Sequence, residues 1–377
     1  MSDSVPLHDA VRAEVQGRLG VLTLTRPGAL NALDLGMAVA ARRQLDAWAT
    51  DRRVAAVWLQ GEGPKAFCAG GDVRAVVEAC AASGSSDPAR AYFEAEYRLD
   101  FLLHTYPKPV LVWGHGFVLG GGLGMLLGGS VRIVTDSTRL AMPEVRIGLF
   151  PDVGASWFLS RLGGVGAWLA LTAARVTGGD AIDLGLADVF VPEVERDTLR
   201  EALGQADLSS SDSVVGVVAP FVRRSGTRLL PARRARLDAL VASCADDAAL
   251  VQAVLALVDD PDPWIADGAR TLRDGSPTAA RVTLAHLRRC RTLGLADVFR
   301  ADLALAVRAS EGQEFAEGVR ALLVDKGRAA SWSPAAHEAV DAARIGALLD
   351  ARLVPDPLAD LVGTGRHERD PHPDHAV

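Results

Sequence analysis

The feature that most limits the possible folds of this chain is an apolar run from Pro109 to Gly129 that contains eight glycines. Glycines spaced this closely, with a histidine among them, indicate tight turns and close backbone contacts rather than a membrane-spanning helix. The run opens with Val110–Trp113, a short apolar stretch that is typical of a buried strand. We therefore expect a buried strand that leads through a glycine-rich turn into a helix, and no membrane partner.

Strand and helix patterns alternate along the first half of the chain. Short apolar or alternating runs predict strands at 13–15, 21–25, 54–60, 110–113, 131–134, 140–142 and 189–191, the first two forming a hairpin. Helical spacing predicts helices at 31–48, 74–79, 153–162, 167–174 and 180–186. This alternation favours an α/β core.

The second half of the chain has a different pattern. From about residue 196 to 360 it is almost wholly helical, and the last residues are rich in His, Pro, Asp and Arg without apolar periodicity. We predict a core over residues 1–195, a mostly helical region over 196–362 and a disordered tail over 363–377. A chain of 377 residues is long enough for two or three domains, or for one large domain with an extension.

Composition and charge exclude several classes of protein. Hydrophobic residues make up 49% of the chain and charged residues 23%, so it can bury a large core and is not a disordered or collagen-like polymer. The formal net charge is −7, so the chain lacks the overall basic character of many nucleic-acid-binding proteins. A local basic patch could still exist in an acidic protein. We expect no nucleic-acid partner.

The four cysteines, at positions 68, 80, 244 and 290, give information about metal sites and redox environment. They form no CxxC pair and have no histidine at metal-ligand spacing, so we expect neither a zinc site nor a disulfide framework. This pattern fits a reducing compartment. Asp3 and Asp9 precede any apolar run, which is unlike a secretory signal. The sequence therefore predicts a cytoplasmic protein without a bound metal.

Three segments combine turn-forming glycines with polar side chains, and the first covers residues 66–73 (AFCAGGDV). Its two glycines allow a sharp turn, so that backbone N–H groups could point at an anion or a carbonyl oxygen. The alternative is an ordinary strand-to-helix turn in which Asp72 caps the following helix. The local pattern alone favours the ordinary turn. Cys68 fits a small buried residue better than an activated thiolate.

The second segment covers residues 114–124 (GHGFVLGGGLG) and follows the strand at 110–113. A glycine turn, a helix N-terminus and Asp136 at the end of the next strand together suggest a dinucleotide site. The spacing is GxGxxxG rather than GxGxxG, however, and a hairpin precedes it. Three consecutive glycines instead suit a helix N-terminus whose N–H groups face developing negative charge. His115 is best explained as a packed structural histidine.

The third segment covers residues 142–154 (MPEVRIGLFPDVG) and places Glu144 and Asp152 in an apolar loop before a helix. Carboxylates among apolar side chains tend to have shifted pKa values, which suits acid–base or nucleophilic catalysis. The alternative pairs Glu144 with Arg146 or another cation, and uses Asp152 to cap the helix that starts near Val153. The residues alone leave both interpretations open.

These three segments, in this order, resemble the enoyl-CoA hydratase/isomerase (crotonase) superfamily. The motifs that carry the resemblance are LTRP (24–27), ALNAL (29–33), AFCAGGD, GGG and PE-x-x-x-G. Within the superfamily, the closer resemblance is to the 3-hydroxyisobutyryl-CoA hydrolases. It is carried by AFCAGGDVR (66–74), EYRL (96–99), AMPE with IGLFPDVGAS (141–156) and EGVRALLVDK (317–326). The resemblance spans almost the full chain and is poorest over residues 200–290.

The resemblance implies an α/β fold, a crotonase-like spiral of ββα units with a mostly helical C-terminal part, whose core binds a CoA thioester. The backbone N–H groups of Gly71 and Gly121 would form an oxyanion hole for the thioester carbonyl. Glu144 would be the main catalytic carboxylate with Asp152 as its partner, and Glu96 would contact the acyl portion. The residues along the CoA path, largely through backbone atoms, would be Ala29, Leu30, Ala66, Gly70 and Asp72.

Three classes of function follow from the resemblance. The first is a thioesterase that hydrolyses a short β-hydroxyacyl-CoA similar to 3-hydroxyisobutyryl-CoA. The second is an enoyl-CoA hydratase or isomerase, although hydratases of the superfamily carry another catalytic glutamate at the position of Gly124. The third is a CoA-ester-binding protein with little turnover. The expected partner is an acyl-CoA substrate, with CoA as part of the substrate, no separate cofactor and no metal; a homo-oligomer is left open.

Overall fold

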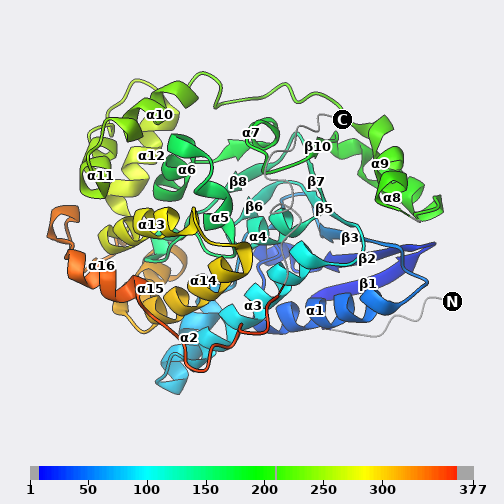
Figure 1. Ribbon diagram of the computed structural model, residues 1–377, viewed down its shortest axis with the longest axis horizontal. Helices are drawn as coiled ribbons and strands as arrows, with labels where there is room; N and C mark the ends of the chain where they lie inside the picture. The colour runs from blue at the N-terminus through cyan, green and yellow to red at the C-terminus, as the bar shows by residue number, and fades with distance from the viewer. Residues whose placement is uncertain (1–7, 209, 363–377) are drawn as a thin grey trace.

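The structure is a computed structural model that describes residues 8–208 and 210–362, and the tail predicted over 363–377 lies outside the described residues. Two β-sheets form its N-terminal half, and most of the helices pack to one side of them (Figure 1). The larger sheet has the order β1 (Val11–Gln16), β2 (Leu19–Leu24), β3 (Ala56–Gly61), β5 (Val110–Gly114), β7 (Val131–Val134) and β10 (Val189–Phe190). The smaller sheet has the order β4 (Ala66–Cys68), β6 (Phe117–Leu119), β8 (Arg139–Ala141) and β9 (Val176–Thr177).

Successive strands alternate between the two sheets, which gives the chain a spiral path. β3, β5 and β7 enter the larger sheet, and the strand after each of them, β4, β6 or β8, enters the smaller one. Within each sheet these strands pair in parallel. Helices follow the strands of the smaller sheet, namely α2 (Val73–Ser83) and α3 (Asp87–Thr105) after β4, α4 (Gly121–Gly128) after β6, and α5 (Ala155–Leu159) after β8. These ββα units confirm the predicted fold.

The two faces of the larger sheet bury different hydrophobic clusters, because successive side chains of a strand point to opposite faces. On β3, Val57 and Leu59 belong to the main cluster, whereas Trp58 belongs to a second cluster on the outer face. The indole of Trp58 stacks on that of Trp113 with ring centroids 5.5 Å apart. Two helices contribute apolar side chains to this second cluster, α8 (Arg196–Gln205) and α9 (Ser211–Val218).

After β10 the described residues form only helices and loops, as predicted. The helices between the strands and in the C-terminal part are α1 (Leu35–Thr50), α6 (Gly163–Thr172), α7 (Gly178–Asp183), α10 (Arg234–Ala242), α11 (Asp247–Leu255), α12 (Pro263–Asp274), α13 (Pro277–Cys290), α14 (Leu295–Ser310), α15 (Gln313–Val319) and α16 (Ala342–Leu349). Figure 1 shows α10 to α16 together on the side of the molecule opposite to α8 and α9. The division at residue 195 stays a prediction; one hydrophobic cluster extends from Ala10 to Leu361, across that position.

The structure differs from the sequence predictions at short strands, at one helix start and at α3 (Asp87–Thr105), a helix of 19 residues that was not predicted. β4, β6 and β9 were not predicted, whereas β8 and β10, which are as short, were. Two or three residues are too few to show a periodic pattern reliably. The helix predicted from residue 31 begins at Leu35, since Asp34 accepts a hydrogen bond from the Met37 N–H as its N-cap. Upstream of this cap, Leu30 and Asn31 have φ values of 52° and 56°, which are incompatible with a right-handed helix.

Asp72 provides a test of helix capping, because its carboxylate accepts a hydrogen bond from the Ala75 N–H at 3.2 Å and pairs with Arg26 at 2.9 Å. We expect Asp72→Asn to lower the free energy of unfolding by less than about 1 kcal/mol, since Asn caps nearly as well and a partly exposed ion pair contributes little. Asp72→Ala, which loses the cap, should cost about 1 kcal/mol more. Urea unfolding of both variants checks this, and equal losses would show that capping is not the role of Asp72.

Candidate active site

Two glycine turns meet at the centre of the site. β4 and β6 are parallel neighbours, with Ala66 opposite Phe117, so the glycines that follow each strand come together. A Cβ atom placed on Gly70 would lie 3.6 Å from the backbone nitrogen of Gly121. One placed on Gly121 would lie 3.6 Å from the backbone nitrogen of Gly71. The positive φ of Gly70, 101°, is a second reason why a side chain is disfavoured here.

The backbone N–H groups of Gly71 and Gly121 are both available to a ligand. Gly121 is the first residue of α4, so its N–H has no acceptor within the helix. Within residues 8–208 and 210–362, no hydrogen bond has the N–H of Gly71 as its donor. The structure thus brings together the two donors that the resemblance assigned to an oxyanion hole.

Four carboxyl groups gather around these glycines. Glu96 and Asp100 lie one turn apart on α3 and therefore on the same face of that helix. Glu144 begins a short 3-10 turn after β8, and Asp152 follows in the same loop. A Cβ atom on Gly121 would lie 2.0 Å from Glu96 Oε1, and one on Gly120 would lie 2.8 Å from Glu144 Oε1. The carboxyl groups of both glutamates therefore lie directly beside the N-terminus of α4.

All four carboxyl groups are buried, and they have almost no polar partners. Their exposed fractions are 3% for Glu96, 0% for Asp100, 5% for Glu144 and 4% for Asp152. Asp152 Oδ2 accepts a hydrogen bond of 2.5 Å from the Tyr97 hydroxyl. Among the described residues, no partner is present for Glu96 Oε1, for Glu144 Oε2 or for either oxygen of Asp100. A buried charge without a cation or hydrogen bonds is costly, so the environment favours the protonated forms.

Burial and mutual repulsion raise the pKa of every member of this group. Burial raises the pKa of Glu96 to about 8, with the charge of Asp152 adding to the shift. Burial raises the pKa of Asp152 to about 7, and the hydrogen bond from Tyr97 opposes part of this shift. Burial, together with the charges of neighbouring carboxylates, raises the pKa of Glu144 and of Asp100 well above the ordinary range. The four carboxyl groups therefore retain protons near neutral pH and titrate as one coupled set.

The structural alternative for the third segment is wrong. Among the described residues Glu144 has no ion-pair partner, and Arg146 beside it is exposed. The residue at the N-cap of α5 is Gly154, not Asp152, and no side chain caps that helix. The carboxylate of Asp152 instead lies in the buried cluster of four carboxyl groups, where it accepts a hydrogen bond from the Tyr97 hydroxyl. Both carboxylates that the sequence singled out are therefore in the same buried cluster.

The structural alternatives for two other residues are confirmed. Asp72 caps α2 through its hydrogen bond with the Ala75 N–H. His115 is fully buried, with Nε2 2.8 Å from the Gly63 carbonyl oxygen, as expected of a packed structural histidine. Neither residue belongs to the buried cluster of four carboxyl groups.

The residues predicted along the CoA path lie on adjoining segments. Ala29 ends a short 3-10 turn, and the carbonyl of Leu30 accepts a hydrogen bond from the Ala69 N–H at 3.0 Å. The carbonyl of Gly70 accepts one from the Leu33 N–H at 2.9 Å, and Asp72 follows two residues later. The predicted residues Ala29, Leu30, Ala66, Gly70 and Asp72 are thus brought together beside the glycine turns, and their contact with CoA stays a prediction.

Asn31 fixes this arrangement and was not singled out from the sequence as a site residue. Its side chain is 1% exposed and donates hydrogen bonds to the carbonyls of Ala66, at 2.9 Å, and Glu62, at 3.0 Å. Its Oδ1 accepts a hydrogen bond of 3.0 Å from the Arg26 N–H. Asn31 therefore joins the turn at residues 26–31 to β4. An asparagine three residues after the Pro27–Gly28 pair, in a segment of turn-forming residues, was the sequence signal that could have found it.

Sequence reasoning missed two further residues at this site: Asp100, a member of the carboxyl cluster, and Tyr97, which donates a hydrogen bond to it. The signal for Asp100 was its spacing of four residues from Glu96, which places both carboxyl groups on one face of a helix. Tyr97 lies in the EYRL motif, but its distance of 55 residues from Asp152 gives no local indication that the two side chains meet. Contacts of this kind depend on tertiary structure.

The position of Gly124 leaves no room for another carboxylate. A Cβ atom there would lie 2.6 Å from the Cβ of Val153 and 3.0 Å from Asp100 Oδ2. Real Cβ atoms essentially never approach other atoms this closely, so Val153 and Asp100 occupy the space into which a side chain at position 124 would project.

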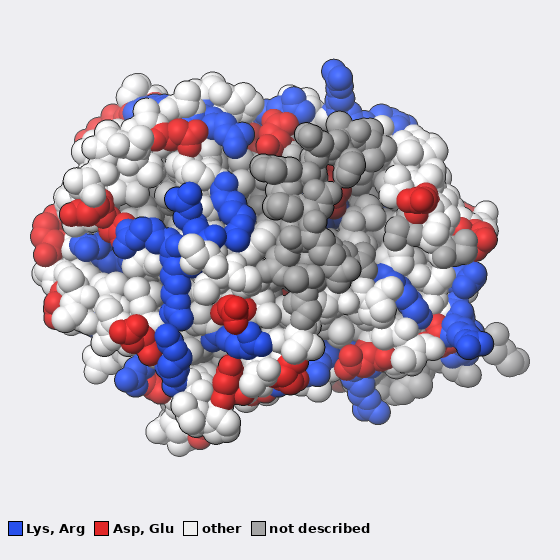
Figure 2. Space-filling view, in the orientation of Figure 1, with Lys and Arg blue, Asp and Glu red and all other residues white. Residues whose placement is uncertain are grey.

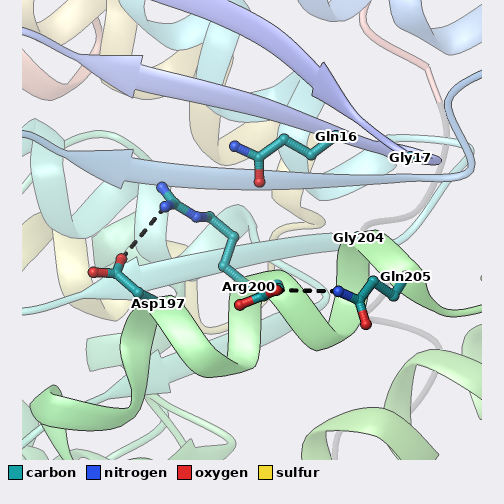
Figure 3. A pocket seen from close by; sticks show the side chains of 7 residues that line it. Gln16, Gly17, Asp197, Arg200, Gly204 and Gln205 are labelled. Carbon is teal, nitrogen blue, oxygen red and sulfur yellow. Dashed lines mark hydrogen bonds and ion pairs between the residues drawn. The ribbon is translucent and has the colours of Figure 1, made fainter.

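A surface pocket away from these carboxyl groups is lined by charged side chains that pair with one another. Figure 3 shows a pocket between the β1–β2 turn and α8, in which Arg200 pairs with Asp197 and Gln205 donates to Glu201. Acidic and basic side chains are interspersed on the face shown in Figure 2. In the part of the chain that the structure describes, no three His, Cys, Asp or Glu side chains are grouped to hold a metal ion, and no helix is long and apolar enough to cross a membrane. All four cysteines are free.

Comparison with known proteins gives consistent results at the level of sequence. A family model described as enoyl-CoA hydratase/isomerase matches residues 19–349. A chicken (Gallus gallus) protein named 3-hydroxyisobutyryl-CoA hydrolase, mitochondrial, is 35% identical over 336 residues, which cover 88% of this chain and 86% of that protein. The human (Homo sapiens) protein of the same name is 33% identical over 341 residues, 89% of this chain and 87% of that protein.

Solved structures match over nearly the whole chain as well. A structure described as a carnitinyl-CoA dehydratase from Mycobacterium thermoresistibile has a TM-score of 0.84 and 35% identity, and the match covers 93% of this chain and 98% of that one. A structure described as an enoyl-CoA hydratase from Rhodobacter sphaeroides has a TM-score of 0.83 and 33% identity, over 92% and 99% of the two chains. The chain therefore belongs to the enoyl-CoA hydratase/isomerase family.

Proposed function

We propose that this protein hydrolyses a short β-hydroxyacyl-CoA thioester, similar to 3-hydroxyisobutyryl-CoA, to the free acid and CoA. The observation that carries the proposal is the position of Glu144 beside two N–H donors, those of Gly71 and Gly121, that are free to bind a carbonyl oxygen. Relatives at 33–35% identity over most of the chain, named 3-hydroxyisobutyryl-CoA hydrolase, support the choice of reaction.

The glycine N–H groups would stabilise the transition state of the attack on the thioester. When the carbonyl carbon is attacked, its oxygen becomes an oxyanion, and two fixed donors at the N-terminus of α4 match that charge. Loss of one such donor typically costs about 3 kcal/mol in activation free energy. Because these donors belong to the backbone, they are held in place without any side-chain rearrangement.

Glu144 would supply the base or the nucleophile. As a general base it would take a proton from water while the hydroxide attacks the carbonyl carbon, the C–S bond breaks and the CoA thiolate takes up a proton. As a nucleophile it would form an acyl-glutamyl anhydride with release of CoA, and water would then hydrolyse the anhydride. Both routes need Glu144 in its ionised form. The charge of Asp152 raises the pKa of Glu144, so protonation of Asp152 favours ionisation of Glu144.

A second candidate function is hydration or dehydration of a CoA ester. Two solved structures with TM-scores of 0.84 and 0.83 to this chain are described as a dehydratase and a hydratase, which favours this reading. Against it stands position 124, where the hydratases of the superfamily carry a glutamate and this chain has a glycine without space for a side chain. We therefore rank hydrolysis first.

The proposed substrate is itself the small-molecule partner, and CoA is part of it, so the proposal requires no separate cofactor. The names of the animal relatives place those proteins in mitochondria. The cytoplasmic location stays a prediction for this chain, and whether it forms a homo-oligomer stays open.

The most direct variant of the proposal is Glu144→Gln, which keeps the volume of the side chain and removes its negative charge. We expect thiol release from 3-hydroxyacyl-CoA esters to fall at least about a thousandfold, while the dissociation constant of the ester stays within about threefold. Asp152→Asn should also lower kcat, and the two losses should not add in the double variant, because the residues act as one unit. Single-turnover assays beside thermal melts separate this outcome from loss of folded protein.

The assay that discriminates the candidate functions measures two reactions of the wild-type protein side by side. Thiol release from a panel of acyl-CoA esters is expected to be fast, and hydration of crotonyl-CoA slow. Fast hydration without thiol release would reverse the ranking. Tight binding of the esters with neither reaction would favour a CoA-ester-binding protein with little turnover, and a stable Glu144→Gln variant with normal thiol release would remove Glu144 from the mechanism.

Protonation of the four buried carboxyl groups makes the free energy of unfolding depend on pH. Because the pKa values of these buried acids are raised on folding, the folded state holds protons that the unfolded state has released above pH of about 4. The free energy of unfolding therefore falls as the pH rises, by about 1.4 kcal/mol per pH unit for each such proton. The fall ends when the pH passes the folded-state pKa, about 7 for Asp152 and about 8 for Glu96.

Asp100→Asn removes one of these titrations, since an amide of nearly the same shape is neutral at every pH. Between pH 5.5 and 7, we expect the unfolding free energy of this variant to fall less steeply with pH than that of the wild type. The difference between the two slopes should be about 1.4 kcal/mol per pH unit. The matched control is Asp259→Asn, an exposed aspartate whose variant should follow the wild type. Urea unfolding at several pH values is the measurement, and parallel curves for Asp100→Asn would show that Asp100 is ionised in the folded protein.

A further inference from the structure

The loop that carries Asp152 has an unusual backbone. Val153 and Gly154 have φ values of 52° and 75°. A β-branched residue in the left-handed region is strained and persists only where the surrounding structure determines it. The Val153 side chain also closes the space beside Gly124. Contacts from neighbouring elements must therefore stabilise this turn, and the same contacts then fix the orientation of the adjacent Asp152.

Asp302, on α14, holds the turn from the side of the C-terminal helices. Its Oδ2 accepts a hydrogen bond of 3.0 Å from the Gly154 N–H, and its Oδ1 lies 2.6 Å from His286 Nε2 on α13. Asp302 is 0% exposed, as is His286. Both oxygens of Asp302 therefore have a fixed partner, so its carboxyl group cannot rotate away from Gly154 without breaking two contacts.

The same two helices support the loop at other points. The His286 ring packs edge-to-face on Phe150, with ring centroids 5.1 Å apart. One turn before Asp302, Phe299 lies so close to Gly154 that a Cβ atom there would be 2.9 Å from its ring. Phe299 also packs edge-to-face on Tyr97, with ring centroids 6.1 Å apart, and the hydroxyl of Tyr97 donates to Asp152. Thus α14 contacts both the backbone beside Asp152 and the side chain that binds its carboxylate.

We propose that Asp302 is a positioning residue for the reaction: it fixes the left-handed Val153–Gly154 turn, with His286 fixing Asp302, and so directs the carboxylate of Asp152 toward Glu144. This inference rests on the proposed function for its kinetic consequence. Asp302 does not reach the substrate, because its carboxyl group is occupied by Gly154 and His286. The C-terminal helices then have a role in catalysis beyond covering the core.

The kinetic test combines variants of Asp302 with Asp152→Asn. Asp302→Leu keeps the branched shape and the number of side-chain heavy atoms but has no acceptor, and we expect its kcat for thiol release to fall at least about tenfold with KM within about twofold. Asp302→Asn keeps one acceptor for the Gly154 N–H and should retain most of the activity. In the Asp152→Asn background, the further loss caused by either substitution should be less than about twofold, because Asp302 acts through Asp152. The matched control is Asp297→Asn, an exposed position on the same helix.

Equal fractional losses in both backgrounds would overturn the proposal, since a general structural role lowers activity regardless of Asp152. Wild-type activity in Asp302→Leu would overturn it as well. Hydrogen exchange provides a readout independent of activity: the Gly154 amide should exchange at least about tenfold faster in Asp302→Leu than in the wild type. Unchanged exchange would show that Asp302 does not hold the turn. A wild-type protein that releases no thiol would contradict the proposed function, whereas the exchange result would still decide the role of Asp302.

Discussion

The site depends on the parallel pairing of two very short strands, β4 and β6. Each strand ends in a glycine turn, and their alignment places the backbone of Gly70–Gly71 against that of Gly120–Gly121. A Cβ atom added to Gly71, Gly120 or Gly121 would come within 3 Å of a neighbouring side chain, and two of these neighbours are Glu96 and Glu144. The glycines therefore create both the free N–H groups and the space that the carboxyl groups occupy.

The second physical constraint is the burial of four acids without a cation. In a dry environment such a group cannot be fully ionised, so it holds protons near neutral pH and can exchange them among its members. The C-terminal helices contribute to this environment, because α14 packs on Tyr97 and on the Val153–Gly154 turn. The ββα spiral thus provides the N–H donors and the carboxylates, while the helices after β10 keep the loop of Asp152 in a strained conformation.

Much of the fold and part of the site could be predicted from the sequence. The hairpin, the longer strands and an α/β core were predicted from local periodicity, whereas the ββα spiral was implied by the family resemblance. Glu144 and Asp152 were candidates because of their apolar surroundings, and the family resemblance assigned their catalytic roles. Tyr97 and Asp302 were not, since their contacts with Asp152 and Gly154 join positions 55 and 148 residues apart. Asp100 was within reach, because its spacing from Glu96 is that of one helix face.

The central claim of this account is that the N–H groups of Gly71 and Gly121 bind the thioester carbonyl oxygen. The most direct measurement is the infrared absorption of a thioester labelled with ¹³C at the carbonyl and bound to the inactive Glu144→Gln variant. Two hydrogen bonds to the oxygen weaken the C=O bond, so the account predicts a band at lower frequency than that of the free ester in water. A bound ester whose carbonyl band is unshifted from that of the free ester would contradict it.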